Sequence, residues 1–373
     1  MPRPGADPPA DPPRDEVDVA VIGGGVVGCA IAVALARAGK SVLVLEAGAR
    51  LGTGITSRNS GVIHSGLYYP PGSLKATSCV RGNRLLYQWA KAHGVWHNKV
   101  GKLVVAQQLS QIPDLEALLA NARDNQAPGV QGLTGAQASA REPAITSCAA
   151  IWCPETGIVD QHELVLSLQA AAQAAGATFV LNAPVTGIDS SRSGHQLQTA
   201  RGEIRAERVV NAAGLAADQI AHLAGFDGLP IHPCRGDYYR LHSPVRYQHL
   251  IYPIKDRSHP GLGIHLTLER GGGQRLGPDA TYVDRRDDFS DPPPEKHAVF
   301  LAAAQRLLGP VRPDQLSYDG CGIRPKLRAP SDPDEKDFAL VESPPGILHL
   351  LGIESPGLTA ALDLADRAAV MLG

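Results

Sequence analysis

The chain has 373 residues, of which 43% are hydrophobic and 19% are charged. These fractions are typical of a globular protein, and the length is enough to form two domains. The formal net charge of −2 provides no general attraction for nucleic acid or for an anionic membrane surface, although it is compatible with a local basic pocket. We therefore expect no nucleic-acid partner and a cytoplasmic protein, with attachment to the inner-membrane surface as the alternative location.

The six cysteines form no C-x-x-C pair, and Cys148 and Cys153 have no histidine at zinc-finger spacing. Free cysteines are among the most often buried residues, so we expect buried thiols in a reducing compartment. No Ser-His-Asp order, H-E-x-x-H or D-x-D-x-D-G motif stands out. The sequence therefore favours neither a hydrolase nor a metal site.

The first segment, residues 1–16, is rich in Pro, Asp and Ala. Such a composition buries little apolar surface, so we expect a disordered tail. Residues 19–36 then carry no charge and approach the length of a membrane-spanning helix. The glycines in the first third of this stretch argue against a span, and we expect no transmembrane segment.

A strand, a helix and a second strand are predicted in succession over residues 18–46. Residues 18–24, DVAVIGG, form a continuous apolar run that ends in a turn signal, which is typical of a buried strand. Residues 26–40 place Ala, Val, Ile and Leu on packed helix faces, and Gly39 provides a C-terminal stop. With a strand over residues 41–46, this unit implies a parallel sheet with a right-handed crossover.

Gly23, Gly25 and Gly28 match the pattern G-x-G-x-x-G between that strand and that helix. Gly23 permits a sharp turn, Gly25 permits close approach of a pyrophosphate, and Gly28 lets the helix pack against the sheet. The helix N-terminus offers free N–H groups and a positive dipole end to phosphates. Glu46, which closes the second strand, suits a ribose 2′-hydroxyl. This context predicts a dinucleotide site; a glycine-rich turn that binds nothing is the alternative.

Three further segments favour FAD over NAD as the dinucleotide. Residues 52–66 are rich in Gly, Ser and Thr, residues 211–214 (NAAG) end a later strand, and residues 352–359 (GIESPGLT) lead into the last helix. A helix N-terminus aimed at a ring that becomes anionic on reduction would stabilise it. The predicted cofactor contacts are Gly23, Gly25, Val26, Val27, Gly28, Glu46, Ala47, Thr56, Ser57, Asn59, Ser60, Gly61, Ala213, Gly214, Gly357, Leu358 and Thr359. For the serines and Asn59, a loop of ordinary turn-forming residues is the alternative.

The remaining elements follow from periodicity and turn signals. We expect helices over 74–94, 111–127 and 162–176, and strands over 101–107, from residue 178 and over 205–214. Residues 249–254 and 261–270 alternate like an antiparallel pair. Polar, Pro-rich loops are expected at 291–294 and 330–337. Asp160 and His162 fit a helix-cap region, and we assign them no chemistry.

Four stretches together show a family resemblance: NSGVIHSGLYYPPGSLKATSCVRGNRLLY, GKLVVA, CRGDYYRL and HLIYPI with GLGIHLT and LGPDA. They resemble L-2-hydroxyglutarate dehydrogenases and oxidases, a branch of the D-amino-acid-oxidase-like (DAO) flavoprotein superfamily, from residue 17 onward. The resemblance implies FAD as the cofactor and an α/β fold (α+β overall), with a Rossmann-like FAD-binding domain and an inserted substrate domain on a mixed, largely antiparallel sheet. We place the FAD-binding domain at 17–95, 155–230 and 321–373, and the substrate domain at 96–154 and 231–320.

The chain departs from that branch in three places. It is shorter between LGPDATYV and GCGIRPK, its end reads GIESPGLTAAL where the family has an Asn-Ala-Pro-Ser-Pro-type turn, and GIRPK also resembles amino-acid oxidases. The fold and FAD carry over, whereas the exact substrate does not.

Arg324 lies in the motif CGIRPK, where an arginine of the superfamily grips the substrate carboxylate. A planar guanidinium binds a carboxylate bidentately, which would fix the reacting C–H. A solvated surface arginine is the alternative, and Lys326 either assists Arg324 or is solvated. Arg235 is either part of this region or one half of an ion pair at the domain boundary.

Two histidines compete for the role of base. His64, in VIHSG, would take the proton of a substrate hydroxyl, contact the flavin, or carry a covalent flavin link; a core histidine is the alternative. His265, in GIHLT, is a pocket residue and rival base or else a satisfied sheet histidine. Tyr238 and Tyr252 carry phenols that would bond a carboxylate or hydroxyl, unless they are interfacial tyrosines.

The chemistry that fits best is FAD-dependent oxidation of a small 2-hydroxy acid, L-2-hydroxyglutarate or a close relative, to the 2-oxo acid. Hydride would pass from C2 to flavin N5, and the protein would supply position and field. The alternative is an amino-acid or amine oxidase or dehydrogenase of the glycine-oxidase type, and a third reading is a flavin-binding structural or sensor protein. The electron acceptor stays open between oxygen, a quinone and another protein.

Overall fold

The first predicted strand lies in the middle of an eight-stranded sheet. β1 (Glu16–Ile22) pairs in parallel with β2 (Val42–Leu45) on one side and with β12 (Gly202–Asn211) on the other. The computed structural model describes residues 16–254 and 263–373. The predicted tail therefore lies outside the described residues, except for Glu16, which begins β1. The remaining strands of this sheet are β9 (Thr178–Val180), β10 (Val185–Ser191), β11 (Gly194–Thr199), β19 (Ala339–Glu342) and β20 (Ile347–Leu351).

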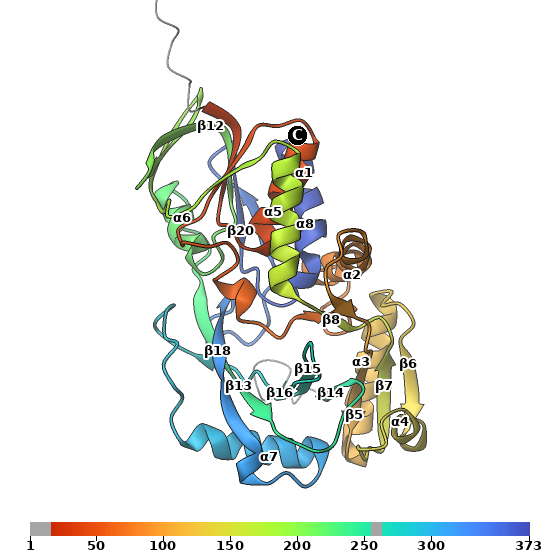
Figure 1. Ribbon diagram of the computed structural model, residues 1–373. Coiled ribbons are helices and arrows are strands. Elements are labelled where there is room, and N and C mark those ends of the chain that lie inside the picture. The colour runs from red at the N-terminus through yellow and green to blue at the C-terminus, as the bar shows by residue number, and fades with distance from the viewer. Residues whose placement is uncertain (1–15, 255–262) are drawn as a thin grey trace, which may run out of the picture.

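Four helices pack together on one face of this sheet. They share one apolar core with β1, β2 and β20, and Figure 1 shows α1, α5 and α8 side by side, to the right of β12 and β20. On the other face, α6 (Ala217–Leu223) packs near β10 and β12. The four helices are α1 (Val26–Arg37), α2 (Leu74–Ala92), α5 (Gln161–Ala174) and α8 (Gly357–Leu372).

A second, nine-stranded sheet forms the lower half of the molecule in Figure 1. α7 (Glu295–Leu308) covers one part of it, and α3 (Ile112–Asp124) and α4 (Gly135–Arg141) lie beside the outer strands. A third, small sheet has the strand order β3-β8-β4, with β3 (Val62–Ile63), β4 (His97–Asn98) and β8 (Gly157–Val159). The nine strands are β5 (Lys102–Ala106), β6 (Gln131–Thr134), β7 (Ala149–Cys153), β13 (His232–Leu241), β14 (Leu250–Pro253), β15 (Leu266–Leu268), β16 (Gln274–Leu276), β17 (Thr281–Tyr282) and β18 (Leu316–Lys326).

The fold class expected from the sequence is confirmed: one large sheet is mainly parallel and carries the glycine turn, and the other is largely antiparallel. The predicted antiparallel pairing of β14 with β15 is present at Ile251 and Leu266. β14 also pairs in parallel with β5, which alternation along one strand does not reveal. The helix-cap prediction is confirmed as well, because the Asp160 side chain accepts from the N–H groups of His162 and Glu163.

The second sheet reaches up to the first through two long strands. β13 and β18 pair antiparallel from His232 opposite Lys326 to Leu241 opposite Leu316. The boundary proposed between residues 320 and 321 falls inside β18, so this strand belongs to the second sheet along its whole length. β18 also contacts the 3₁₀ turns Ile55–Ser57 and Gly214–Ala216, which follow β2 and β12 of the first sheet.

Several features bear on the functional class. No helix in the two described ranges is long and apolar enough to cross a bilayer. Among those residues, no group of His, Cys, Asp and Glu is placed to hold a metal ion. All six cysteines are free thiols; five are buried as predicted, and Cys148 is partly exposed.

Candidate active site

A cavity of about 670 Å³ runs between the two large sheets and is lined by segments from both ends of the chain. One end is formed by the β1–α1 turn. Gly23 adopts φ +108°, and a Cβ there would lie 2.5 Å from the carbonyl oxygen of Ala212. A Cβ on Gly28 would lie 1.9 Å from the carbonyl oxygen of Gly23. Gly28 therefore packs the helix against the turn and does not line the cavity, which agrees with the task that the sequence assigned to it.

Glu46 lies at this same end, at the tip of β2. One carboxylate oxygen accepts from the N–H of Gly24 and the other from the N–H of Gly48, both at 2.7 Å. These bonds fix the carboxylate at the cavity wall. Ala47 lines an adjoining cavity of about 620 Å³, which shares Gly23, Glu46 and Ala213 with the first. A ligand that extends beyond the glycine turn has room there.

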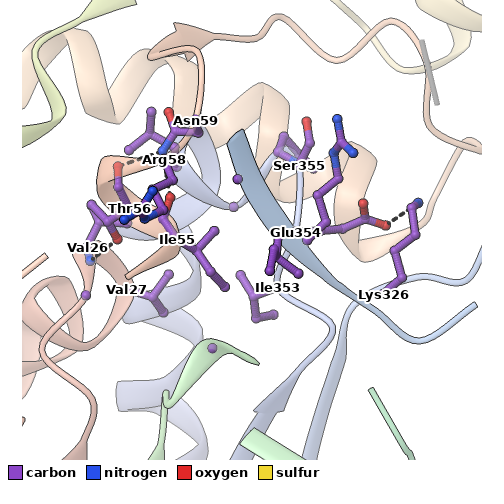
Figure 2. Close-up of a pocket in the computed structure, with 18 of the residues that line it drawn as sticks. Val26, Val27, Ile55, Thr56, Arg58, Asn59, Lys326, Ile353, Glu354 and Ser355 are labelled. Carbon is purple, nitrogen blue, oxygen red and sulfur yellow. Dashed lines mark hydrogen bonds and ion pairs between the residues drawn. The ribbon is translucent and has the colours of Figure 1, made fainter. Parts of the chain in front are cut away.

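The loop after β2 is held by its own hydrogen bonds. Thr56 Oγ1 accepts from the N–H of Val26 at 3.1 Å and so ties the loop to the start of α1, as Figure 2 shows. The Asn59 amide donates to the carbonyls of Ile55 and Thr56 and accepts from Gly61, so it shapes the loop. Of the predicted contacts here, Thr56, Asn59 and Ser60 line the cavity.

Besides Gly28, three of the predicted cofactor contacts stand back from the cavity. Ser57 donates to the carbonyls of Thr53 and Gly54 and is exposed, and Gly61 sits against Val159. Thr359 is fully buried in the first turn of α8. Its Oγ1 accepts from the N–H of His64 at 3.0 Å and donates to the carbonyl of Val62 at 3.3 Å. Thr359 therefore joins α8 to β3 and to His64, the residue after that strand.

Apart from Gly28 and Ala47, the other predicted cofactor contacts line the cavity, so the structure brings both chain ends together. α8 begins at Gly357 and directs the positive end of its dipole to the cavity wall. Arg58, which the sequence analysis missed, also lines it and lies 3.9 Å from the ring of Phe289. The cavity-lining members of the predicted set are Gly23, Gly25, Val26, Val27, Glu46, Thr56, Asn59, Ser60, Ala213, Gly214, Gly357 and Leu358.

All five predicted catalytic residues line the far part of the cavity. The rings of Tyr252 and His265 stack with centroids 3.8 Å apart. His265 Nδ1 lies 2.8 Å from the carbonyl oxygen of Gly263 and donates to it, which leaves Nε2 as the acceptor. Tyr238 is buried, and the guanidinium carbon of Arg275 lies 3.8 Å from the centroid of its ring.

Both histidines are neutral in this environment. Burial is the largest cause that lowers the pKa of His64 well below its usual value, and the charge of Lys102 adds to it. Burial lowers the pKa of His265 to about 3, although its bond to Gly263 opposes the shift. A neutral imidazole is the form that accepts a proton.

Four buried polar atoms around the cavity have no hydrogen-bond partner among the described residues. They are His64 Nδ1, Tyr68 Oη, Tyr252 Oη and Arg324 Nη1, and all four residues line the cavity. Leaving a buried polar group unpaired costs about 1–3 kcal/mol, so four together at one wall indicate a site built for a polar ligand. The other arm of Arg324, Nη2, donates to the carbonyl of Asp279 at 3.0 Å, which orients the guanidinium.

Lys102 and Tyr68 were missed by the sequence analysis. Lys102 opens β5 and is 1% exposed. Its Nζ lies 4.7 Å from the ring centroids of both Tyr68 and Tyr252. Burial lowers the pKa of Lys102. The sequence did contain a signal for Lys102: it is the first residue of an apolar strand, in the run GKLVVA.

Arg235 forms an ion pair with Asp237 and is not part of the cavity wall. Its guanidinium donates to Asp237 at 2.7 and 3.0 Å and to the carbonyls of Asp288 and Ser290. Both Arg235 and Asp237 are buried, and neither lines the cavity.

A glycine turn at a helix N-terminus, a long cavity closed by the last helix, and a cluster of unpaired polar groups at its far end define a flavin-dependent oxidoreductase. The chain belongs to the FAD dependent oxidoreductase (DAO) family, whose family model matches residues 18–369. The cofactor is therefore FAD. Residues around the glycine turn, in the 56–60 loop and at the start of α8 line the cavity.

Within this family, the chain is similar to proteins named L-2-hydroxyglutarate dehydrogenase. The chain is 35% identical to the mitochondrial L-2-hydroxyglutarate dehydrogenase of Arabidopsis thaliana, over 95% of this chain and 83% of that protein. It is 39% identical to the mitochondrial enzyme of that name from Homo sapiens, over 73% of this chain and 62% of that protein. The fold is that of FAD-bound L-α-glycerophosphate oxidase from Mycoplasma pneumoniae, with a TM-score of 0.87, 24% identity and coverage of 96% and 94%.

Proposed function

We propose that this oxidoreductase converts a small 2-hydroxy acid, L-2-hydroxyglutarate or a close relative, to the 2-oxo acid. The observation that carries the proposal is the set of unpaired polar groups at the far end of the cavity, in which a guanidinium and a neutral imidazole face the same space. The relatives named L-2-hydroxyglutarate dehydrogenase support the choice of substrate.

Each group has a task in this proposal. Arg324 binds the C1 carboxylate with Nη1, while Asp279 holds Nη2 in place. His64 Nδ1 or His265 Nε2 takes the hydroxyl proton as C2 is oxidised. FAD, when bound, accepts the hydride from C2. The Tyr252 phenol donates to the substrate hydroxyl or carboxylate, and the buried ammonium of Lys102 favours the negative charge that develops on oxygen.

His64 is the better placed of the two bases. Its Nε2 lies 3.4 Å from Ser355 Oγ, so Nδ1 is the nitrogen left for the substrate. Its backbone is fixed from two helices, by the Thr359 hydroxyl on its N–H and by the Asn83 amide on its carbonyl. His265 remains the rival, because its Nε2 is also unprotonated in the tautomer that the Gly263 carbonyl selects. The proposal also includes a cytoplasmic location. The electron acceptor is oxygen, a quinone or another protein.

The test is anaerobic reduction of the FAD-loaded protein by a panel of L-2-hydroxy acids and amino acids. We expect L-2-hydroxyglutarate or a near homologue to bleach the visible flavin absorbance and to yield the 2-oxo acid. Arg324→Met should lower kcat/KM for that substrate about 100-fold, since the charge-assisted contact of Nη1 with the carboxylate is lost. Arg84→Met, at an exposed position of α2, should leave it unchanged.

The amino-acid oxidase alternative makes the opposite prediction for the same panel. A flavin that stays oxidised with every hydroxy acid at millimolar concentration, or ammonia released with amino acids, would refute the hydroxy-acid proposal. His64→Gln separates the two chemistries as well, because an unprotonated amine loses hydride without a base.

A further inference from the structure

A second group of charged side chains lies beyond Arg324 in the same cavity. Lys75, Lys326 and Glu354 all line it, although they come from α2, β18 and the turn before α8. One oxygen of Glu354 accepts from Lys75 Nζ at 2.9 Å and from Lys326 Nζ at 3.1 Å. Figure 2 shows Lys326 and Glu354 directed toward each other at one side of the cavity.

The two lysines are far more buried than lysines normally are. The side chains of Lys75 and Lys326 are 8% and 5% exposed, and that of Glu354 is 8% exposed. Lys75 also donates to the carbonyl of Lys336 at 2.8 Å, and Lys326 reaches Glu335 at 3.2 Å. An ammonium has three N–H groups, so each lysine keeps one for a ligand after these contacts with described residues. Burying two ammonium groups is costly unless they are paired, and Glu354 supplies that pairing at the cavity wall.

The strand geometry fixes the spacing between the two cationic groups. Arg324 and Lys326 alternate with Pro325 on β18, opposite Cys234 and His232 of β13. Residues i and i+2 of a strand share a face and lie roughly 6.7 Å apart along it. Both side chains line the same cavity. The two carboxyl carbons of a glutarate chain are joined by four C–C bonds of about 1.5 Å and lie about 5 Å apart. The long side chains of Arg324 and Lys326 can make up the difference between the two spacings.

The charges at this end of the cavity favour an anionic ligand. Among the described residues that line it, the cationic side chains exceed the anionic ones by one. An anion would balance this surplus. The cations are Lys75, Arg324, Lys326 and Lys336, and the anions are Glu335, Asp337 and Glu354.

We propose that Lys326, positioned by Glu354 and supported by Lys75, binds a second carboxylate of the substrate and restricts the enzyme to dicarboxylic 2-hydroxy acids of about glutarate length. This inference rests on the proposed function, because it takes Arg324 as the site of the C1 carboxylate. Glu354 is a positioning residue: it holds two ammonium groups at the cavity wall and leaves their remaining donors directed to a ligand. Glu354 lies in the GIESPG turn that leads into α8.

The test compares two substrates that differ only at the distal end, with the FAD-loaded enzyme. L-2-hydroxyvalerate has the carbon chain of L-2-hydroxyglutarate with a methyl group in place of the second carboxylate. We expect Lys326→Met to lower kcat/KM for hydroxyglutarate roughly 30- to 100-fold, mainly through KM, and to change the hydroxyvalerate value less than about threefold. Lys326→Arg should restore most of the difference between the two substrates, since it keeps the charge.

Lys91→Met is the matched control, because Lys91 is exposed in the last turn of α2 and undergoes the same change of charge. If Lys326→Met fails to load FAD, Lys326→Gln takes its place, since it keeps hydrogen-bond donors and removes only the charge. A loss of equal size on both substrates in the folded variant would overturn the proposal.

Binding of unreactive acids gives a second readout that needs no turnover. Glutarate and valerate are titrated by calorimetry into the FAD-loaded wild type and Lys326→Met. Glutarate should bind the wild type at least about tenfold more tightly than valerate, and the variant should lose this preference. If no hydroxy acid reduces the flavin but the glutarate preference depends on Lys326, the proposed function fails and the subsite stands. If hydroxy acids are oxidised without any dependence on Lys326, the subsite fails and the function stands.

Discussion

At the scale of residues, the cavity holds two histidines that can accept a proton and an arginine that can bind a carboxylate. His265 is buried and His64 is partly buried, the pKa of each is lowered, and Arg324 offers one unpaired arm. Lys102 contributes to both histidine shifts from behind the two tyrosines. The base and the carboxylate anchor therefore exist in the folded protein before a substrate arrives.

The first prediction concerns the pH dependence of catalysis. Because burial lowers the pKa of both histidines below 6.5, each stays unprotonated as the pH falls through that value. The acid limb of kcat/KM, which reports on the free enzyme, should therefore lie well below pH 6.5. A kcat/KM profile measured from pH 5 to 9 with the preferred substrate checks this. A decline centred near 6.5 that disappears in His64→Gln would contradict the neutral, buried state of His64.

The second prediction concerns the stability provided by Glu354. Burial alone would raise the pKa of this carboxyl, but Lys75 and Lys326 lower it from 4.5 to about 2. A lowered carboxyl pKa contributes stability that is complete above 4.5 and is lost as the pH falls toward 2. Glu354→Gln should thus cost about 3–5 kcal/mol at pH 7, because buried Lys75 loses its anion and Lys326 keeps only Glu335.

Urea unfolding of wild type and Glu354→Gln between pH 7 and pH 3 measures this effect. The difference in unfolding free energy should shrink as the pH falls below 4.5. A difference that stays constant over the whole range would show that the carboxylate charge is not its source.

At the scale of elements, two close backbone approaches set the shape of the site. The β1–α1 turn closes over Gly28, and α2 touches the first turn of α8 at Gly82. A Cβ on Gly82 would lie 2.3 Å from the carbonyl oxygen of Thr359 and 2.9 Å from the Cα of Ala360. This contact places the N-terminus of α8 and, through Thr359, the backbone of His64.

The third prediction is that Gly82→Ala destabilises the protein and weakens FAD binding. In an exposed helix the same change would stabilise by about 1 kcal/mol, because alanine has the higher helix propensity. Here the added methyl group meets backbone, which cannot move aside as a flexible side chain does, so a cost of about 1–3 kcal/mol is expected. Thermal unfolding and flavin content are measured beside Gln88→Ala, on the exposed face of α2. A higher melting temperature for Gly82→Ala would disprove the close contact.

At the scale of the whole molecule, the cavity is closed by both ends of the chain. The glycine turn of β1 and α1 lies at one end of it, and the last helix lies at the wall near His64. β13 and β18 connect the two large sheets, as Figure 1 shows, and carry Tyr238, Arg324 and Lys326 to this space. FAD would therefore contact segments that only the complete fold assembles.

The fourth prediction is that FAD stabilises the protein as a unit. A ligand that binds only the folded state adds about 2.7 kcal/mol at a hundredfold excess over its Kd. The melting temperature of flavin-depleted protein should rise with FAD concentration, for probes in both sheets alike. A melting temperature that ignores FAD, or a rise confined to the first sheet, would contradict this prediction.

The sequence alone determined the local features whose signals are short-range. The glycine turn, the strand before it, the helix cap at Asp160 and the elements around residues 74–94 and 101–107 follow from turn chemistry and periodicity. These patterns report on neighbours in the chain, which is why they survive folding unchanged. The family resemblance added the fold class and FAD, and the family match confirms both.

Only the tertiary structure decided which side chains meet. Nothing near Lys102 in the sequence indicates the ring faces of Tyr68 and Tyr252, and nothing near Glu354 indicates two lysines from α2 and β18. Likewise, hydroxyl residues such as Ser57 and Thr359 fit a cofactor loop by composition but bond to backbone instead. Burial and pairing depend on which distant elements pack together, because a charged group is tolerated inside a protein only where the fold supplies its partner.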